Sequence, residues 1–298
     1  MIKYFSAFSG IGGFELGIGN KGTCVGCSEI DEYALKIYKK HFPEHKNFGD
    51  ITKINKIPKH DLFVGGFPCQ PYSSAGQRKG FDDPRAKAFL TMLRLIKKYR
   101  PKHIILENVA SMGKEMQNEI TAKISNAINR NIMVTRIDSA LVSAQTRKRI
   151  FWTTFPVEQP VDKKIFLKDI IEHGAVDRMK SYAIDCNYYK GSNLTQYIER
   201  ARRQLVFIRK ANARILRNLR EEGQKGWCLS ATAWKGMQAN GMTSISDKGF
   251  IRKLTPLECE RLQTFPDNWT EGISNTRRYK ALGNAVTVNA IKHIMSNY

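Results

Sequence analysis

The sequence predicts an α/β protein with a doubly wound, mostly parallel β-sheet and a smaller, irregular domain. Two observations support this fold class. Over residues 1–160, short apolar segments that suit buried strands alternate with longer segments that suit amphipathic helices, the order that builds a parallel sheet covered by helices. Over residues 161–275 this alternation stops, and a helical apolar pattern returns over residues 276–298, which we expect to rejoin the first domain.

The expected elements of the first domain follow one another in a regular order. A strand is expected where a short apolar run ends at a glycine or a polar residue, and a helix where apolar residues recur on one face. Because ligands of such folds bind beyond the carboxyl ends of the strands, residues that follow a strand are the candidates for a binding site. Strands are expected at residues 2–8, 24–30, 61–67, 103–109 and 132–140, and helices at residues 14–20, 31–42, 86–99 and 115–128.

The irregular domain contains one segment with a helical pattern, residues 199–222. Within it, residues 200–220 carry eight Lys and Arg side chains and no acid. A solvated helix face is a fair interpretation of any single one of these cations. A run of cations without a counter-charge favours contacts with phosphate groups, for which Arg202 and Arg209 are the candidates.

The whole chain is strongly basic. Its 298 residues include 49 Lys and Arg against 27 Asp and Glu, a formal net charge of +22. Such a charge attracts polyanions such as nucleic acids, although an inert basic surface or an anionic membrane would also fit. No apolar run approaches the roughly 18 residues that span a bilayer, and the N-terminus does not suit a signal peptide. We therefore expect a soluble, cytoplasmic protein.

The cysteines are scattered, which in such a protein favours free thiols. Cys24 and Cys27 have the C-x-x-C spacing, but no second pair and no histidine cluster accompanies them. Since a zinc site usually needs four ligands at matching spacing, no metal is expected.

A glycine turn, Gly10-Ile11-Gly12-Gly13, follows the first expected strand, and Glu29 ends the second. This arrangement indicates a nucleotide-type cofactor whose ribose is bound by the acid, although glycine turns also serve packing alone. Glu15 stands where a dinucleotide fingerprint would have glycine, and a carboxylate there would face a pyrophosphate poorly. An adenosine without a phosphate fits better, which points to S-adenosylmethionine.

Cys69 lies in the segment GGFPCQPYSSAG, directly after an expected strand. A single cysteine there is either an inert packed residue or an activated thiol. Glu107 favours the second interpretation, because it follows the apolar strand residues 104–106, where an isolated charge is costly unless it is paired or used. Arg147 and Arg149 stand at strand spacing, with Gln145 on the same expected face, and can bind an anion or a base edge.

A thiol, a carboxyl group and an arginine pair beside an adenosyl cofactor suit methylation of cytosine at C5. A thiolate that adds to C6, with an acid acting at N3, makes C5 nucleophilic, and the thiol leaves after methyl transfer. The cytosine must leave the stacked duplex to be reached, so base flipping is expected.

Six segments in family order resemble the motifs of DNA (cytosine-5) methyltransferases of prokaryotic or phage type. The resemblance covers nearly the whole chain and implies a Rossmann-like methyltransferase fold with a target-recognition domain. The segments are FSGIGGFELG, GGFPCQPYS, ENV, QTRKRIFW, RKLTPLECERLQTFPDNW and YKALGNAVTVNAI.

The resemblance implies a role for each matching residue. Cys69 is implied as the nucleophile, and Glu107 as the residue at N3 and the amino group of the cytosine, with Arg147 and Arg149 supporting that pocket. Gln70 and Ser73 are implied near the DNA backbone or the vacated base position. The S-adenosylmethionine site is implied to include Phe8, Gly10, Gly12, Glu29 on the ribose, Ile30, Asp50 on the adenine amino group, Ile51 and Asn284.

Some of these roles have a plain alternative. Asp50 could cap the segment after it, and Asn284 could be a turn residue. The target-recognition part is expected over residues 161–250, where Trp234 lies in a Gly- and Ser-rich stretch that suits a loop in the major groove or an ordinary surface loop. The residues do not specify the target sequence.

Two other functions compete with DNA methylation. Transfer RNA methylation on the same fold is one, although the long recognition part favours double-stranded DNA. A DNA-binding module without activity is the other, which the retained catalytic motifs disfavour. We expect a monomer that has no metal.

Overall fold

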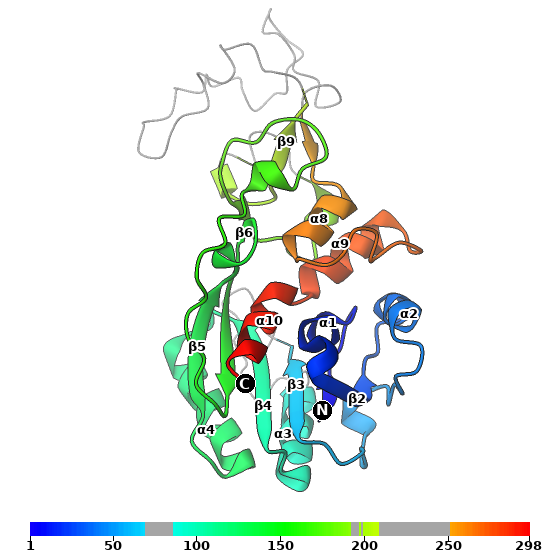
Figure 1. Cartoon of the computed structure of the whole chain (residues 1–298), viewed down its shortest axis with the longest axis vertical. Coiled ribbons are helices and arrows are strands. Elements are labelled where there is room, and N and C mark those ends of the chain that lie inside the picture. The colour runs from blue at the N-terminus through cyan, green and yellow to red at the C-terminus, as the bar shows by residue number, and fades with distance from the viewer. Residues whose placement is uncertain (69–85, 192–196, 198, 209–250) are drawn as a thin grey trace, which may run out of the picture.

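The structure, a computed structural model of the chain, describes all residues except 69–85, 192–196, 198 and 209–250 (Figure 1). A six-stranded sheet forms its centre, in the order β2-β1-β3-β4-β7-β5. All neighbouring strands from β2 to β4 pair in parallel, whereas β7 runs antiparallel between β4 and β5. The predicted mostly parallel sheet is therefore confirmed. Its strands are β1 (Ile2–Ala7), β2 (Gly22–Ser28), β3 (Leu62–Gly66), β4 (His103–Val109), β5 (Met133–Asp138) and β7 (Lys148–Thr153).

The helices expected in the first 160 residues are present as well, with boundaries within two residues of those expected. Asp31 begins the second of them as its N-cap, accepting hydrogen bonds from the N–H groups of Tyr33 and Ala34. The helices are α1 (Gly13–Ile18), α2 (Glu32–His41), α3 (Ala86–Tyr99) and α4 (Lys114–Ile128).

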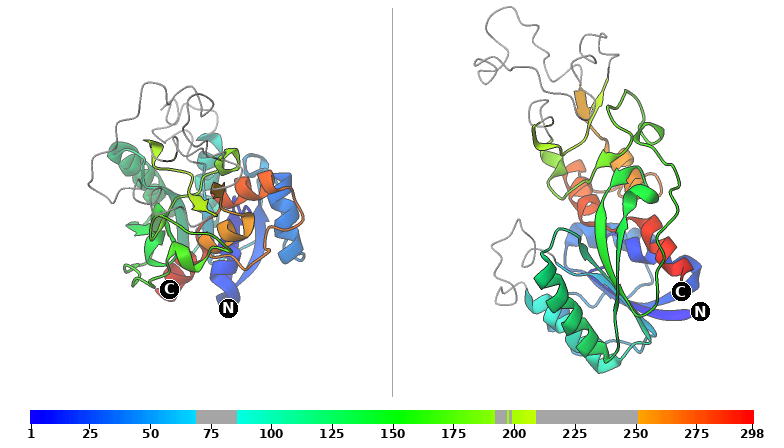
Figure 2. Two further views of the ribbon diagram at one scale, coloured as in Figure 1. Left: turned by 90° about the horizontal axis from the view of Figure 1, so that it is seen from above. Right: turned by 90° about the vertical axis from the view of Figure 1, so that its left-hand side faces the viewer.

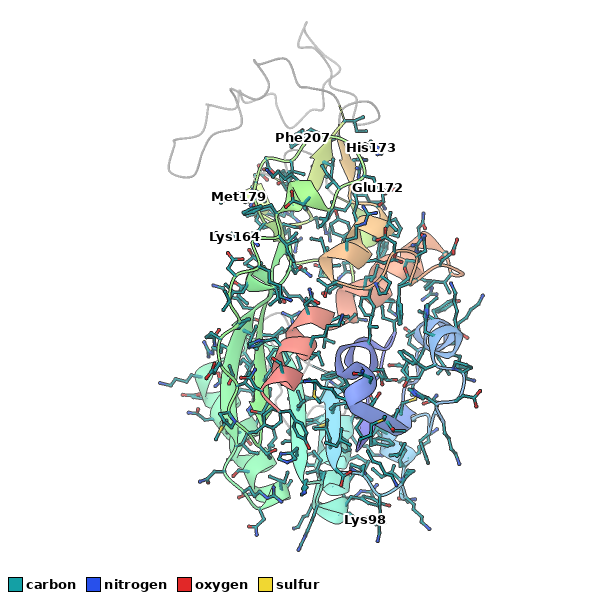
Figure 3. The ribbon with its side chains drawn as sticks, in the orientation of Figure 1. Lys98, Lys164, Glu172, His173, Met179 and Phe207 are labelled. Atoms are coloured by element: carbon teal, nitrogen blue, oxygen red, sulfur yellow. The ribbon has the colours of Figure 1, made fainter. Side chains whose placement is uncertain are left out.

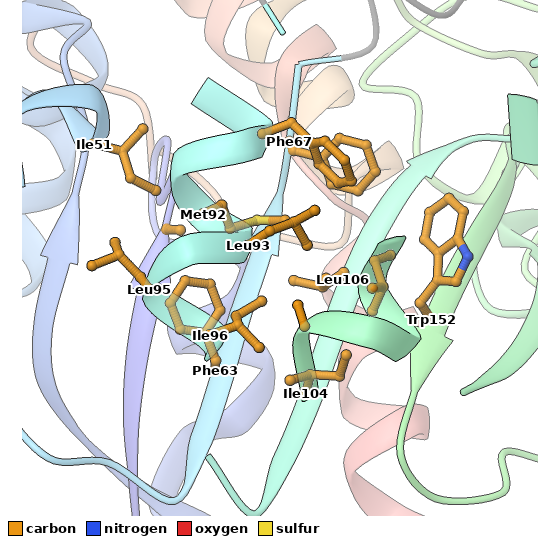
Figure 4. Packing of buried hydrophobic residues seen from close by; sticks show 14 of the residues in the cluster. Ile51, Phe63, Phe67, Met92, Leu93, Leu95, Ile96, Ile104, Leu106 and Trp152 are labelled. Atoms are coloured by element: carbon orange, nitrogen blue, oxygen red, sulfur yellow. The ribbon is translucent and has the colours of Figure 1, made fainter. Parts of the chain in front are cut away.

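Helices cover both faces of the sheet (Figure 2). Because successive strand residues point to opposite faces, Phe63 packs on one face while its neighbours Leu62 and Val64 pack on the other. The first face is covered by α3 and α4, and Figure 4 shows Met92 and Ile96 of α3 against it. The second face is covered by α1 and by α10 (Val288–Ser296), which together bury a continuous apolar cluster. The doubly wound arrangement is therefore confirmed.

The C-terminal residues return to this domain through α10, which packs along α1. The contact is close, since a Cβ added at Gly17 would lie 2.5 Å from the side chain of Ile291. Before it come α8 (Pro256–Leu262) and α9 (Asn275–Asn284), which lie beyond the carboxyl ends of the central strands (Figure 1). Among the described residues, none of the helices has the length and hydropathy that crossing a bilayer requires.

The upper part of the molecule contains short two-stranded sheets (Figure 3). They pair β6 (Gln145–Thr146) with β8 (Ser181–Tyr182), and β9 (Leu205–Phe207) with β10 (Ile251–Lys253). The prediction of a helix over residues 199–222 is wrong at residues 205–207, which form the strand β9. Ala201 and Arg203 have φ angles of +46° and +58°, which a right-handed helix does not allow, and the apolar run that follows is fully buried in an antiparallel pair. Residues 209–222 of that predicted helix lie outside the described residues.

Candidate active site

Several of the expected site residues that the structure describes lie at one edge of the sheet. Gly10 follows β1, Glu29 follows β2, and Gly66 ends β3. Glu107 of β4 stands directly opposite Gly66 in the parallel register. Because these strands are parallel, their carboxyl ends share one edge, where ligands of doubly wound sheets bind.

Glu107 is held at this edge by an ion pair with Arg149. Nε of Arg149 lies 2.7 Å from Oε1 of Glu107, and the side chains are only 19% and 12% exposed. Arg149 comes from β7, which pairs with β4. On the other side, a Cβ added at Gly66 would lie 2.9 Å from Oε2 of Glu107. The carboxyl group is therefore fixed between two neighbouring strands, as is required of an acid that must meet one atom of a substrate.

Asn108 connects β4 to the segment that follows β3. Its buried Nδ2 donates to the carbonyl of Phe67 over 3.0 Å, and its Oδ1 accepts from the N–H of Val109 over 2.8 Å. The chain that leads to Cys69 therefore leaves the sheet from a fixed point. Asn108 is not among the residues expected here from the sequence. A second polar residue inside an apolar strand is the signal that marks it.

Arg147 and Arg149 do not lie on one strand face. Arg147 falls between β6 and β7, so the alternation of side chains within one strand does not relate the two arginines. Gln145, expected on the same face, is buried and donates to the carbonyl of Leu262 over 2.8 Å. Arg147 and Gln145 thus anchor the C-terminal segments. The guanidinium group of Arg147 donates to the carbonyls of Ile184, Gly283 and Ala285.

The turn after β1 has the backbone geometry that close approach of a ligand requires. Phe8, Gly10 and Gly12 have φ angles of +55°, +56° and +89°, in the left-handed region that L side chains rarely adopt. A Cβ added at Gly10 would meet no described atom within 4 Å, so this glycine faces open space. A non-glycine residue such as Phe8 in this region is strained, and such strain is typical of functional sites.

Glu29 closes the other side of this turn. Its Oε2 accepts from the N–H of Gly10 over 2.8 Å, and its Oε1 accepts from the N–H groups of Ile30 and Asp31, each over 2.7 Å. The side chain of Ile30 is 73% exposed. An apolar side chain left in solvent beside a carboxylate and a glycine turn suits the wall of a ligand site.

Asp50 has the capping role that its sequence position also allowed. Its Oδ1 accepts from both the N–H and the hydroxyl of Thr52, over 2.9 and 2.8 Å. Oδ2 has no hydrogen-bond partner among the described residues, so a contact with adenine stays a prediction. The side chain of Ile51 is 3% exposed and packs in the core, and its contact with the cofactor stays a prediction. Asn284, the last residue of α9, is exposed.

Glu15, which stands where a dinucleotide fingerprint would have glycine, lies beneath the glycine turn and is buried. The side chain is 2% exposed, and Oε1 accepts from the hydroxyl of Tyr38 over 3.0 Å. Burial raises the pKa of Glu15 to about 7. Burial also raises the pKa of Cys24 to about 12 and that of Cys27 to about 11, so both of these sulfurs are neutral thiols.

We expect Glu15→Gln to make the stability of the protein less dependent on pH. Because burial raises the folded-state pKa from 4.5 to about 7, the folded protein binds more protons than the unfolded chain within that window. Stability therefore falls as the pH rises through it. The free energy of unfolding should be measured for both proteins at about pH 5 and about pH 8. Its fall between the two should be smaller in the variant than in the wild type by roughly 1–3 kcal/mol. Equal falls would contradict the ionisation of a buried Glu15.

The remaining predicted site residues are Arg202 and five that lie outside the described part of the chain. Arg202 is described and exposed, immediately before β9. In the described part of the chain, no group of three or more His, Cys, Asp or Glu side chains is arranged to hold a metal ion. The predicted site residues that lie outside the described part of the chain are Cys69, Gln70, Ser73, Arg209 and Trp234.

Known proteins resemble this chain over nearly its full length. The profile of the C-5 cytosine-specific DNA methylase family matches residues 2–298. The Type II methyltransferase M1.ScrFI of Lactococcus lactis subsp. cremoris is 32% identical, over 98% of this chain and 76% of its own. The Type II methyltransferase M.HhaI of Haemophilus parahaemolyticus is 29% identical, over 99% of this chain and 94% of its own.

Solved structures share the fold at lower sequence identity. The Entamoeba histolytica methyltransferase EhMeth superposes with a TM-score of 0.72 at 19% identity, covering 100% of this chain and 97% of its own. A Spodoptera frugiperda DNMT2 variant superposes with a TM-score of 0.71, also at 19% identity, covering 100% and 99% of the two chains.

Proposed function

The chain belongs to the C-5 cytosine-specific DNA methylase family and is a DNA cytosine-5 methyltransferase, and we propose that Cys69, Glu107 and Arg149 carry out its chemistry. Its substrate in this proposal is a cytosine flipped out of a specific sequence in double-stranded DNA. The observation that supports it most is the fixed carboxyl group of Glu107, beside the strand end that leads to Cys69. When bound, S-adenosylmethionine supplies an electrophilic methyl group and becomes S-adenosylhomocysteine.

In the proposed reaction, the thiolate of Cys69 adds to C6 of the cytosine while Glu107 gives a proton to N3. The electrons of the C5–C6 double bond then become available at C5, which takes the methyl group. A base removes the C5 proton, the Cys69–C6 bond breaks with its electrons returning to sulfur, and N3 returns its proton to Glu107. Arg149 holds Glu107 in place throughout, through its 2.7 Å contact.

The residues at the strand ends fit an adenosyl group. We propose that the ribose hydroxyls replace backbone partners on Glu29, that the apolar side chain of Ile30 covers the adenine, and that Asp50 accepts from the adenine amino group through Oδ2. Phe8 and the glycine turn would form the floor. Asn284, exposed at the end of α9, is proposed to complete the site.

The remaining proposals concern partners and organisation. We propose that residues 1–160 with 276–298 form the catalytic domain and that residues 161–275 recognise the DNA, with Arg202 contacting a phosphate. We also propose that the protein acts as a monomer. The relatives are bacterial Type II methyltransferases, which supports action on DNA in the cytoplasm.

Methyl transfer assays will test this function directly. With tritiated S-adenosylmethionine, we expect label in double-stranded DNA and none in transfer RNA offered at equal cytosine concentration. Bisulfite sequencing of the product should place 5-methylcytosine at one recurring sequence. Label in transfer RNA alone would contradict the proposed substrate.

A further inference from the structure

The glycine turn after β1 is held by a residue from the far end of the chain. Trp269 lies between α8 and α9, and its indole Nε1 donates to the carbonyl of Ile11 over 2.8 Å. Both residues are buried in the same apolar cluster, although they are 258 positions apart. Ile11 stands between Gly10 and Gly12, at the centre of the turn.

The indole group completes the hydrogen bonding of that turn. The N–H of Gly12 donates to the carbonyl of Ser9 over 3.0 Å, and the N–H of Gly10 donates to Glu29. The peptide unit between Ile11 and Gly12 is therefore fixed at both ends, at its oxygen by Trp269 and at its N–H by Ser9. A buried carbonyl that lost this donor would destabilise the turn in its present conformation.

Trp269 itself has little freedom to move. The ring of His41, at the end of α2, stacks on the indole with centroids 3.6 Å apart and planes 4° apart. Nε2 of His41 lies 2.8 Å from the carbonyl oxygen of Trp269, to which it donates. Since α2 begins at Glu32, three residues after Glu29, the same contacts connect Trp269 through this helix with the second strand end of the site.

We propose that Trp269 is a positioning residue for the cofactor, which acts by fixing the Ile11 peptide in the turn that receives S-adenosylmethionine. This inference rests on the proposed function, because it assumes that the turn binds that molecule. Without the indole N–H, the turn samples other peptide orientations, and part of the binding free energy is used to restore the present one. Cofactor affinity should fall, whereas the chemistry at Glu107 should be unchanged once the cofactor is bound.

Trp269→Phe tests this, because it keeps an aromatic ring and removes the donor. Calorimetry with S-adenosylhomocysteine should give a Kd about threefold to tenfold higher, the effect of one hydrogen bond. KM for S-adenosylmethionine should rise by a similar factor, with kcat at saturation within about twofold of wild type. Trp152→Phe is the matched control, since its indole donates to Thr121 over 2.8 Å in the core beneath α4.

The outcomes separate this inference from the proposed function. An unchanged Kd in Trp269→Phe would overturn the inference, and so would an equal rise in Trp152→Phe, which would indicate a general loss of packing. Failure of the wild-type protein to bind S-adenosylhomocysteine would instead overturn the proposed cofactor site. If Trp269→Phe does not fold, His41→Leu leaves Trp269 in place and removes both the stacking ring and its hydrogen bond to the Trp269 carbonyl. It should raise Kd by about twofold, and no change would count against the role of Trp269.

Discussion

Duplex DNA that carries 5-fluorocytosine at the target position will become covalently attached to the wild-type protein, and the Cys69→Ala protein will not become attached at all. Fluorine replaces the C5 proton whose removal allows the thiol to leave, so after methyl transfer the Cys69–C6 bond has no route to break. The adduct should survive boiling in detergent. Its amount can be measured as radiolabelled DNA that migrates with the protein on a denaturing gel, with S-adenosylmethionine present.

A second cysteine variant makes that experiment specific. Among the described residues, Cys186 is a partly exposed free cysteine, so Cys186→Ala controls for nonspecific reaction of thiols. It should form the adduct in wild-type amount. If Cys69→Ala still formed the adduct and Cys186→Ala did not, the nucleophile would be Cys186. The assignment of Cys69 would then be wrong, and a different reaction scheme would be required.

The sheet could be predicted from the sequence because its strands are short apolar runs separated by amphipathic helices. The central strands are buried on both faces, so β3 contains only apolar side chains and glycine and β4 contains the apolar run 104–106. This pattern needs no knowledge of distant contacts. The same use of apolar periodicity gave a wrong prediction for the segment at residues 199–222. Its apolar residues have helical spacing, but the three in β9 are buried by pairing with β10, which lies far along the chain. Periodicity alone cannot detect such a partner.

The site could be predicted in its residue types but not in the directions of all its side chains. Glu107 and Arg149 meet because neighbouring strands bring them together. Arg147 points away from Arg149 because its guanidinium group donates to the carbonyls of Ile184, Gly283 and Ala285, which belong to distant parts of the chain. Trp269 illustrates the same limit, since its partner Ile11 is known only once the chain has folded.

Glu107→Gln should lower kcat by about 10²–10⁴-fold, the range that one positioned acid contributes. Glutamine has the same shape, and its amide oxygen can still accept from Nε of Arg149, so the pocket should keep its geometry. It cannot give a proton to N3, so negative charge would build up on the ring as the thiolate adds. DNA affinity, measured by gel shift with S-adenosylhomocysteine present, should change by less than about threefold. Unchanged turnover would remove Glu107 from the mechanism.

Gly66→Ala is the matched test of position, because it leaves the carboxyl group in the protein and displaces it. The added Cβ would lie 2.9 Å from Oε2 of Glu107, a distance that forces the side chain to move away from its contact with Arg149. A misplacement of this size should reduce kcat by about tenfold or more while the acid itself remains. If Gly66→Ala were fully active while Glu107→Gln was not, the acid would be needed but its fixed position would not. The ion pair with Arg149 would then have to be assigned to stability instead of catalysis.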